Sequence, residues 1–246
     1  MYNPFSLKEK IILVTGASSG IGAGISNGLA NMGANIIVTG RNRERLLNTF
    51  NNLPTGNHNY YVSDLLRIDK IDELVSTLPI LDGLVLCAGI VKTMPVKNIK
   101  DSAIEEIFQT NIISSIQLCK RLLRSKKIAK GGSIVFISSV STFNVKIGNS
   151  LYSATKGAVN SFAKAMALEL APQKIRVNCI QPGFIETGLL NNGIISKEQI
   201  ENYATKHPLG LGNPSDISNG CIYLLADASR WMTGSIITID GGLTLQ

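Results

Sequence analysis

The sequence has none of the features that mark a membrane-spanning or metal-binding protein. Its apolar runs are far shorter than the roughly 20 residues that a bilayer-spanning helix needs. The early apolar run, 11–14, leads directly into a glycine-rich turn, so it predicts a strand rather than a signal peptide. The two histidines, His58 and His207, are far apart and predict surface or loop positions. We therefore expect no membrane association and no metal site.

Cysteine is scarce, and its spacing is not that of a disulfide framework. The four cysteines, Cys87, Cys119, Cys179 and Cys221, show no paired spacing and stand in apolar surroundings. This pattern predicts buried free thiols rather than disulfides or metal ligands. Free thiols are typical of a reducing compartment, so the expected location is the cytoplasm.

Linkers, repeats and aromatic clusters are also missing. No Pro/Ser/Gly-rich or charge-segregated stretch divides the 246 residues, and 44% of them are hydrophobic, enough for a large core. We expect a single domain over residues 1–246. The net charge of +7 favours anionic partners such as acidic carrier proteins or phosphorylated cofactors. The densest basic cluster, 120–130, lacks aromatic residues for base stacking, so we expect a solvated helix end and no nucleic-acid binding.

What the sequence does contain is an alternation of short apolar runs with amphipathic helical patterns. The runs predict strands at Ile11–Val14, Asn35–Thr39, Tyr60–Val62, Gly83–Leu86, Ser133–Ile137, Arg176–Ile180 and Ile236–Ile239. Strands that are apolar throughout and separated by helices are typical of a parallel sheet covered on both faces. The predicted fold is α/β, a Rossmann-type doubly wound sheet of about seven strands with helices on both faces and a ligand crevice at the strands' carboxyl ends.

Apolar stripes predict the helices between these strands. The stripe of a middle helix runs from Ile104 through Ile107 and Asn111 to Leu122. An unpaired amide would be costly in such a stripe. Asn111 therefore predicts either a functional residue or a polar residue that packs between helices.

A glycine-rich turn follows the first predicted strand. In the run Thr15-Gly-Ala-Ser-Ser-Gly-Ile-Gly22, the glycines permit a tight turn and bring backbone N–H groups and a helix N-terminus against a ligand. Strand, glycine turn and helix in this order predict a dinucleotide diphosphate site.

The end of the second predicted strand indicates which dinucleotide binds. Enzymes that use NAD place a carboxylate here on the ribose 2′-OH, whereas this chain reads Gly40-Arg41-Asn42-Arg43 with no carboxylate before Glu44. A guanidinium can clamp a 2′-phosphate with two hydrogen bonds. The sequence predicts NADP in preference to NAD, with a plain surface charge as the alternative for Arg41.

Tyr152 and Lys156 lie four residues apart, so they share one face of a helix. A phenol is too weak an acid to ionise readily at neutral pH, and a neighbouring ammonium favours its phenolate form. Ser139, thirteen residues before Tyr152, adds a hydroxyl. A phosphate cradle, a phenol, an ammonium and a hydroxyl are the parts needed for hydride and proton transfer at a carbonyl.

These motifs, in this order and spacing, resemble the short-chain dehydrogenase/reductase family, single-domain type, from about Lys8 to Gly242. The resemblance implies a ketone reductase or alcohol dehydrogenase with a nicotinamide cofactor. It also implies that Tyr152 is the proton donor, that Lys156 holds the nicotinamide ribose and tunes Tyr152, that Ser139 polarises the substrate oxygen, and that Asn111 supports a proton relay. Within this chain Ser138 is a chemical alternative to Ser139, and the spacing to Tyr152 favours Ser139.

The family's cofactor contacts map onto the glycine turn, the ends of later strands and the active-site pair. The expected cofactor-binding residues are Gly16, Ser18, Ser19, Gly20, Ile21, Gly22, Arg41, Asp64, Leu65, Ala88, Gly89, Tyr152, Lys156, Pro182, Gly183, Ile185 and Thr187. In relatives the last segment grips the nicotinamide carboxamide, which implies transfer of the pro-S hydride. The tail 239–242 implies a homotetramer.

The chain departs from the family pattern after the fourth strand. Relatives usually read Asn-Asn-Ala-Gly, and this chain reads Leu86-Cys87-Ala88-Gly89. The lost amides normally steady the central sheet, and a thiol bonds only weakly. We expect a stability cost and retained catalysis.

Substrate choice is expected in a lid at about 184–214. The segment is largely apolar and suits an acyl or alicyclic chain: Leu189, Leu190, Ile194, Ile195, Tyr203 and Leu209. The first hypothesis is reduction of a 3-oxoacyl thioester on an acyl carrier protein, with basic residues facing the acidic carrier: Lys126, Lys127, Lys130 and Lys174. The alternatives are a carbonyl reductase or alcohol dehydrogenase for a free small molecule, steroid-like or sugar-derived, and a non-catalytic NADP-binding regulator.

Overall fold

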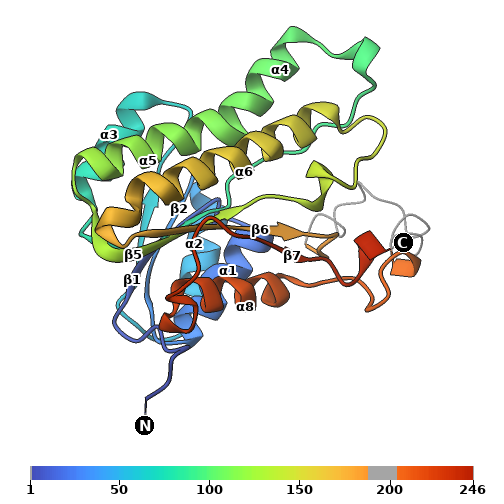
Figure 1. Cartoon of the computed structure of the whole chain (residues 1–246). Coiled ribbons are helices and arrows are strands. Elements are labelled where there is room, and N and C mark those ends of the chain that lie inside the picture. The colour runs from blue at the N-terminus through green and yellow to red at the C-terminus, as the bar shows by residue number, and fades with distance from the viewer. Residues whose placement is uncertain (1, 188–203, 246) are drawn as a thin grey trace.

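The apolar runs predicted as strands form one parallel sheet in a computed structural model, which describes residues 2–187 and 204–245 (Figure 1). The strands are β1 (Ile11–Thr15), β2 (Asn35–Gly40), β3 (Asn59–Val62), β4 (Leu81–Leu86), β5 (Ile128–Ile137), β6 (Arg176–Pro182) and β7 (Ile236–Ile239). Their order is β3-β2-β1-β4-β5-β6-β7, and every neighbouring pair is parallel. The predicted doubly wound fold is confirmed.

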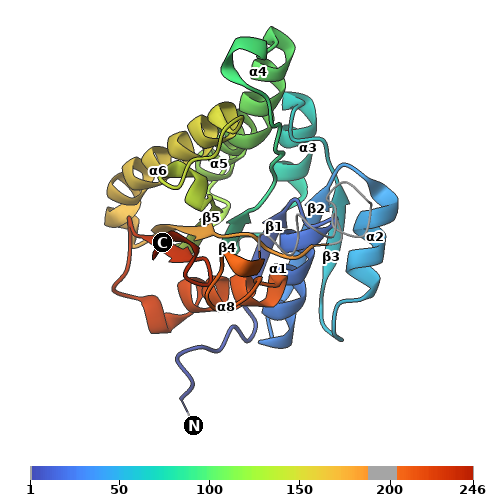
Figure 2. The same cartoon turned by 90° about the vertical axis from the view of Figure 1, so that its right-hand side faces the viewer.

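Helices cover both faces of the sheet (Figures 1 and 2). They are α1 (Gly20–Asn31), α2 (Arg43–Asn51), α3 (Ile68–Thr77), α4 (Asp101–Phe108), α5 (Ser114–Arg124), α6 (Ser150–Leu170) and α8 (Pro214–Leu225). One face carries α1, α2 and α8, and the other carries α3, α5 and α6. No helix in the described ranges is long and apolar enough to cross a membrane.

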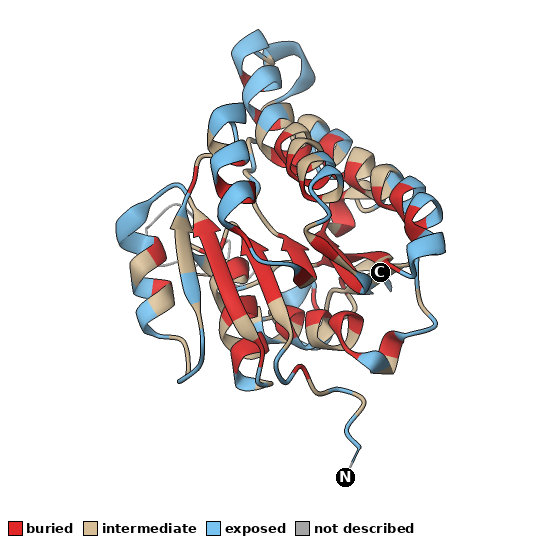
Figure 3. Ribbon diagram, turned by 90° about the vertical axis from the view of Figure 1, so that its left-hand side faces the viewer, coloured by how far each residue is buried: buried red, intermediate tan, exposed pale blue. Residues whose placement is uncertain are grey.

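Each face has its own core, and the central strands contribute to both. Leu13 and Phe136 point to the side of α5 and α6, where the Phe136 ring meets Phe162 edge-on at 6.0 Å between centroids. Val14 and Val135 point to the side of α1 and α8. Figure 3 shows the buried strands between helices that are buried only along their inner sides. Each fully buried Leu or Phe stabilises the fold by roughly 1.5–3 kcal/mol, so strands with two apolar faces hold the layers together.

The middle helix differs from its prediction. A π-helical turn, Gln109–Ile113, separates α4 from α5 and carries Asn111 into the buried side. Ile107 is fully buried, but Ile104, predicted in the same stripe, is 39% exposed. The physical reason is that α4, which extends past the end of the sheet (Figure 1), packs inward along the side that carries Ala103 and Ile107, so Ile104 lies beside that buried stripe.

The connections between strands change direction beside β1. The chain leaves β1 toward β2 and β3 on one side and returns to β4 on the other, so the connections diverge between β1 and β4. Open parallel sheets bind ligands outside the carboxyl ends of the strands at such a point. The predicted cofactor and catalytic residues all follow these carboxyl ends.

Candidate active site

The glycine turn requires glycine for space as well as for backbone conformation. Gly16 has φ +65°, and a Cβ there would lie 2.7 Å from the Ala88 Cα. A Cβ at Gly22 would lie 2.3 Å from the Gly16 carbonyl oxygen. Ser19, the N-cap of α1, makes no capping hydrogen bond with its side chain and is exposed. The first amides of α1 and this hydroxyl are therefore open to a ligand, as a diphosphate cradle needs.

Thr15 joins the end of β1 to the turn after β4. It is fully buried at the end of β1, and its hydroxyl oxygen accepts hydrogen bonds from the backbone N–H of Cys87 at 3.1 Å and of Ala88 at 3.3 Å. The backbone at the end of β4 is thus held by a threonine at the end of β1. Sequence reasoning missed Thr15, whose signal was a polar residue at the end of an otherwise apolar strand.

The residues expected at the adenosine side directly follow β2 and β3. Arg41 is exposed directly after β2, and the neighbouring Gly40 lies against Ser18, whose side chain would be 3.3 Å from a Cβ at position 40. Asp64 follows β3, and its carboxylate accepts from the Leu66 N–H at 3.1 Å, so it stabilises its own turn. Leu65 packs against the core from its half-buried position.

Asn111 is 1% exposed and uses its whole amide within the protein. Its Oδ1 accepts from the Ile90 N–H at 2.7 Å, and its Nδ2 donates to the Ile90 carbonyl at 2.9 Å and to the Thr155 hydroxyl at 3.1 Å. Thr155 in turn donates to the Tyr152 carbonyl at 2.8 Å. The amide therefore joins the loop after β4 to the helix that carries the predicted catalytic pair.

Lys156 is 5% exposed, and its ammonium donates to the Ile137 carbonyl at 2.7 Å. The same nitrogen lies 5.7 Å from the centroid of the Tyr152 ring, and Tyr152 is half-buried. A Cβ at Gly89 would lie 3.5 Å from the Lys156 Nζ and 3.3 Å from the Asn111 Oδ1. The Asn111 amide oxygen and the Lys156 ammonium therefore both lie within contact distance of the loop after β4 at Gly89.

The two serines after β5 have different environments. Ser138 is 2% exposed, and its hydroxyl donates to the Lys156 carbonyl at 3.3 Å. Ser139 is half-buried, and its oxygen accepts from the Ser141 N–H at 3.1 Å. As an acceptor toward Ser141, Ser139 keeps its own O–H proton for a substrate oxygen. The geometry favours Ser139, as the spacing does.

The segment 182–187 returns to the glycine turn. A Cβ at Gly20 would lie 3.3 Å from the Thr187 Cγ2, so Thr187 lies at the start of α1. Gly183 packs on Asp240, because a Cβ at position 183 would lie 2.8 Å from the Asp240 Cα. The Glu186 N–H donates to the Gly212 carbonyl at 2.7 Å. Of the predicted lid residues, Leu189, Leu190, Ile194, Ile195 and Tyr203 lie outside the described ranges.

Cysteine and histidine take no metal-binding arrangement in the described residues. The cysteines are free and largely buried, as predicted. Burial raises the pKa of the Cys87 thiol to about 11, against a smaller opposing effect of the Lys156 charge, so the thiol stays protonated at neutral pH. His207 lies in a loop as expected but is only 3% exposed, because its Nε2 accepts from the Phe184 N–H at 3.3 Å under the segment 182–187.

Comparisons with known proteins agree with this geometry. A family model described as enoyl-(acyl carrier protein) reductase matches residues 16–244. The 3-oxoacyl-[acyl-carrier-protein] reductase FabG of Aquifex aeolicus is 31% identical over 96% of this chain and 98% of that protein. A tropinone reductase homologue of Arabidopsis thaliana is 32% identical over 98% of this chain and 95% of that protein. The solved structure of a short-chain type dehydrogenase/reductase from Mycobacterium ulcerans superposes with a TM-score of 0.88, 31% identity, and coverage of 98% of this chain and 92% of that one.

Proposed function

The chain belongs to the short-chain dehydrogenase/reductase family, and from this premise we propose that it is an NADP-dependent reductase that converts a ketone to a secondary alcohol. Membership of this family makes it an oxidoreductase acting on CH–OH groups. The main support in this chain is that the buried Lys156 ammonium lies 5.7 Å from the centroid of the Tyr152 ring and, with the Asn111 amide, borders the loop after β4 at Gly89.

The proposed reaction adds a hydride and a proton across a carbonyl. When bound, NADPH supplies the hydride to the carbonyl carbon. The Tyr152 hydroxyl gives its proton to the carbonyl oxygen, and the Ser139 O–H holds that oxygen. The Lys156 cation lies beside the phenol and favours the phenolate that remains. Asn111 holds the helix of Tyr152 against the loop after β4, which keeps these groups in register.

The proposed cofactor residues follow the carboxyl ends of the strands, and their chemistry suits a dinucleotide. The turn 16–22 would hold the diphosphate, Arg41 the adenosine 2′-phosphate, and Asp64 with Leu65 the adenine. Ala88 and Gly89 would let the backbone approach, Lys156 would hold the nicotinamide ribose, and the segment 182–187 would hold the carboxamide. The absence of a carboxylate between Gly40 and Arg43 supports NADP over NAD.

For the substrate we propose a 3-oxoacyl thioester carried on an acyl carrier protein. The similarity to FabG proteins supports this choice. So do exposed aliphatic and aromatic side chains on two loops beside the site, Val91 at 58%, Phe143 at 55% and Ile147 at 95% exposure. The loops are joined by the hydrogen bond from the Met94 N–H to the Gly148 carbonyl at 2.9 Å. An apolar rim suits an acyl chain better than a sugar.

The lysines expected to face the carrier give less support. Lys130 and Lys174 lie at the opposite edge of the sheet, beside the starts of β5 and β6. The Lys127 ammonium donates to the Leu78 carbonyl near the end of α3. A carrier that docks on these lysines of one chain is therefore not adjacent to Tyr152 of that chain.

A free small ketone is the alternative substrate, supported by the similarity to a tropinone reductase homologue. The experiment measures NADPH oxidation with an acetoacetyl thioester on carrier protein, the same thioester on a short thiol, and a panel of steroid, alicyclic and sugar ketones. Higher kcat/KM with carrier-bound than with short thioester is the expected result. Equal kcat/KM for the two would contradict the carrier, and turnover of a panel ketone alone would identify the alternative.

The assembly and location follow the same premise. We propose a single domain that forms a homotetramer through the tail 239–242 and the edge strand β7, and a cytoplasmic location in keeping with the free thiols. Light scattering in solution tests the tetramer, and cell fractionation tests the location. A monomer, or a membrane or secreted fraction, would contradict these points.

A further inference from the structure

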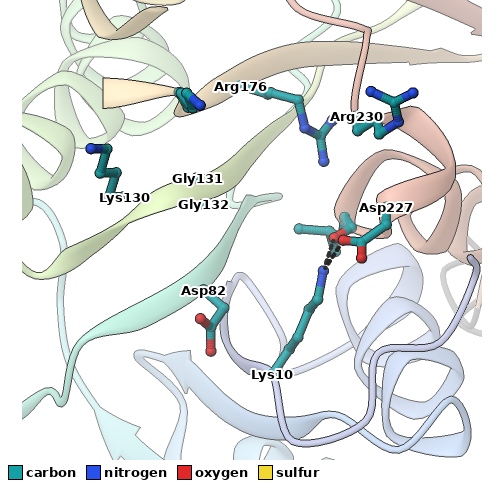
Figure 4. Close-up of a pocket in the computed structure, with 10 residues that line it drawn as sticks. Lys10, Asp82, Lys130, Gly131, Gly132, Arg176, Asp227 and Arg230 are labelled. Atoms are coloured by element: carbon teal, nitrogen blue, oxygen red, sulfur yellow. Dashed lines mark hydrogen bonds and ion pairs between the residues drawn. The ribbon is translucent and has the colours of Figure 1, made fainter. Parts of the chain in front are cut away.

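A second cavity lies at the amino edge of the sheet, the edge opposite Tyr152 and the glycine turn. It has a volume of about 260 Å³. Its walls come from the residue before β1, the start of β4, the first half of β5, the start of β6 and the turn after α8. Figure 4 shows Lys10, Asp82, Lys130, Arg176, Asp227 and Arg230 around it.

The charges around this cavity are unbalanced. Five cationic side chains line it, Lys10, Lys130, Lys174, Arg176 and Arg230, against the two acids Asp82 and Asp227. Both acids already have partners within the protein. The Lys10 ammonium lies 3.1 Å from the Asp227 carboxylate, and Asp82 accepts from the Ile11 N–H at 2.9 Å. The excess of positive charge in a recess favours an anion there.

Arg176 fixes one of these charges at the wall. Its guanidinium donates to the Leu224 carbonyl at 2.7 Å and the Ser229 hydroxyl at 2.9 Å, and more weakly to two further carbonyls. These acceptors are neutral, so they hold the group in place without cancelling its charge. Burial lowers the pKa of Arg176, which reflects the free-energy cost of keeping this cation away from water. An anion in the cavity would lower that cost.

The opposite wall is open backbone. Gly131 has φ +81°, and a Cβ there would meet nothing within 4 Å. The β4–β5 register shifts between Leu81 and Gly83, opposite this part of β5. A ligand can therefore approach the chain at Gly131 without meeting a side chain.

We propose that this cavity binds a small molecule carrying a diphosphate or two neighbouring phosphate groups, separately from the dinucleotide crevice. The excess of three positive charges matches a multiply charged anion rather than a single carboxylate. A recess with Lys10 and Arg176 on its walls favours a small ligand over the convex surface of a carrier protein. The proposal does not depend on the reaction at the carboxyl edge.

The test is calorimetric titration of inorganic pyrophosphate into the full chain at constant ionic strength. The protein is first saturated with whichever of NADPH and NADH binds it, so that the glycine turn is occupied. The double variant Lys130→Gln, Lys174→Gln removes two exposed charges from the cavity. The matched control Lys97→Gln, Lys100→Gln removes two exposed lysines elsewhere.

The expected result is saturable binding with one site per chain, weakened roughly tenfold or more by the cavity variant and unchanged by the control. Equal weakening in both double variants would show a general charge effect and overturn the site. Absence of saturable pyrophosphate binding would overturn it as well. Binding of an acidic carrier protein that Lys130→Gln, Lys174→Gln abolishes, with no binding of pyrophosphate, would assign the cavity to a protein partner and reject the small ligand.

Discussion

Cationic side chains have different surroundings at the carboxyl edge and at the amino edge of the same parallel sheet. At the carboxyl edge, Lys156 is buried, held by one carbonyl, and lies beside a phenol. At the amino edge, Lys10 is paired with Asp227 and Arg176 is held by neutral oxygens among several other cations. The first arrangement places a single buried charge beside one titratable group, and the second gathers several charges around a cavity. The surroundings of a cation at each edge of the sheet, more than its residue type, therefore set what it can contact.

The largest expected effect comes from removing the cation at the carboxyl edge. Lys156→Met should lower kcat/KM for NADPH-dependent reduction on the order of a thousandfold, within the range of general acid–base contributions. Lys164→Met, an exposed lysine on the same helix, is the matched control and should change it little. Steady-state kinetics on both variants measures this difference, and equal activities would remove Lys156 from the mechanism.

Asn111→Leu tests how the carboxyl edge is held together. The change leaves the N–H and carbonyl of Ile90 without their partner in a buried position, so the free energy of unfolding should fall by about 2–4 kcal/mol. Asn31→Leu, at an exposed position, should change it by less than about 0.5 kcal/mol. Urea denaturation measures both. A similar loss in the two variants would mean that the Asn111 hydrogen bonds contribute little.

Arg41→Ala tests the exposed cation at the carboxyl edge. A charged hydrogen bond to the 2′-phosphate contributes about 1.5–3 kcal/mol, so NADPH should bind roughly 10- to 100-fold more weakly, with NADH affinity unchanged. Arg43→Ala, two residues along and also exposed, provides the control. Fluorescence titration measures the NADPH and NADH affinities of the original chain and both variants. If NADH is preferred before and after the change, the assignment of NADP is wrong.

The smallest expected effect concerns the Cys87 thiol, which the Lys156 charge influences. Burial raises the pKa of Cys87 to about 11 in the folded chain, from 9.0 in an unperturbed thiol. Between pH 9 and about 11 the unfolded thiol loses its proton and the folded one keeps it. The contribution of this thiol to the free energy of unfolding is therefore complete below pH 9 and falls as the pH rises above it. At pH 10 the loss is roughly 1 kcal/mol for this group. Urea denaturation at pH 8 and pH 10 should show a smaller loss in Cys87→Ala than in the original chain, and an unchanged loss would contradict the shift.

The sequence predicted the carboxyl edge well because local patterns encode it. Apolar runs placed the strands, and glycine spacing placed the turn whose close approach to Ala88 the structure shows. The spacing of Tyr152 and Lys156 placed both residues on one helix, with the Lys156 ammonium beside the Tyr152 ring. Parallel strands carry their loops and helices out of the carboxyl ends, so strand–turn–helix motifs mark that edge and leave the other without a signature.

What could not be predicted depends on contacts between distant segments. The π-helical turn that buries Asn111 follows from packing, and the exposure of Ile104 follows from which side of α4 packs inward. His207 is buried because a remote backbone N–H meets it. Thr15 holds two backbone N–H groups only because β4 ends beside it. The amino-edge cluster unites residues from 10 to 230, and no spacing rule relates them.

The proton donor is the central claim, and Tyr152→Phe tests it most directly because the change removes one hydroxyl and keeps the ring. The measurement pairs NADPH binding by fluorescence with turnover of the best ketone found for the original chain. We expect unchanged NADPH affinity and a loss of kcat of roughly 10²- to 10⁴-fold. Turnover within a few-fold of the original rate, with the cofactor bound as before, would contradict it.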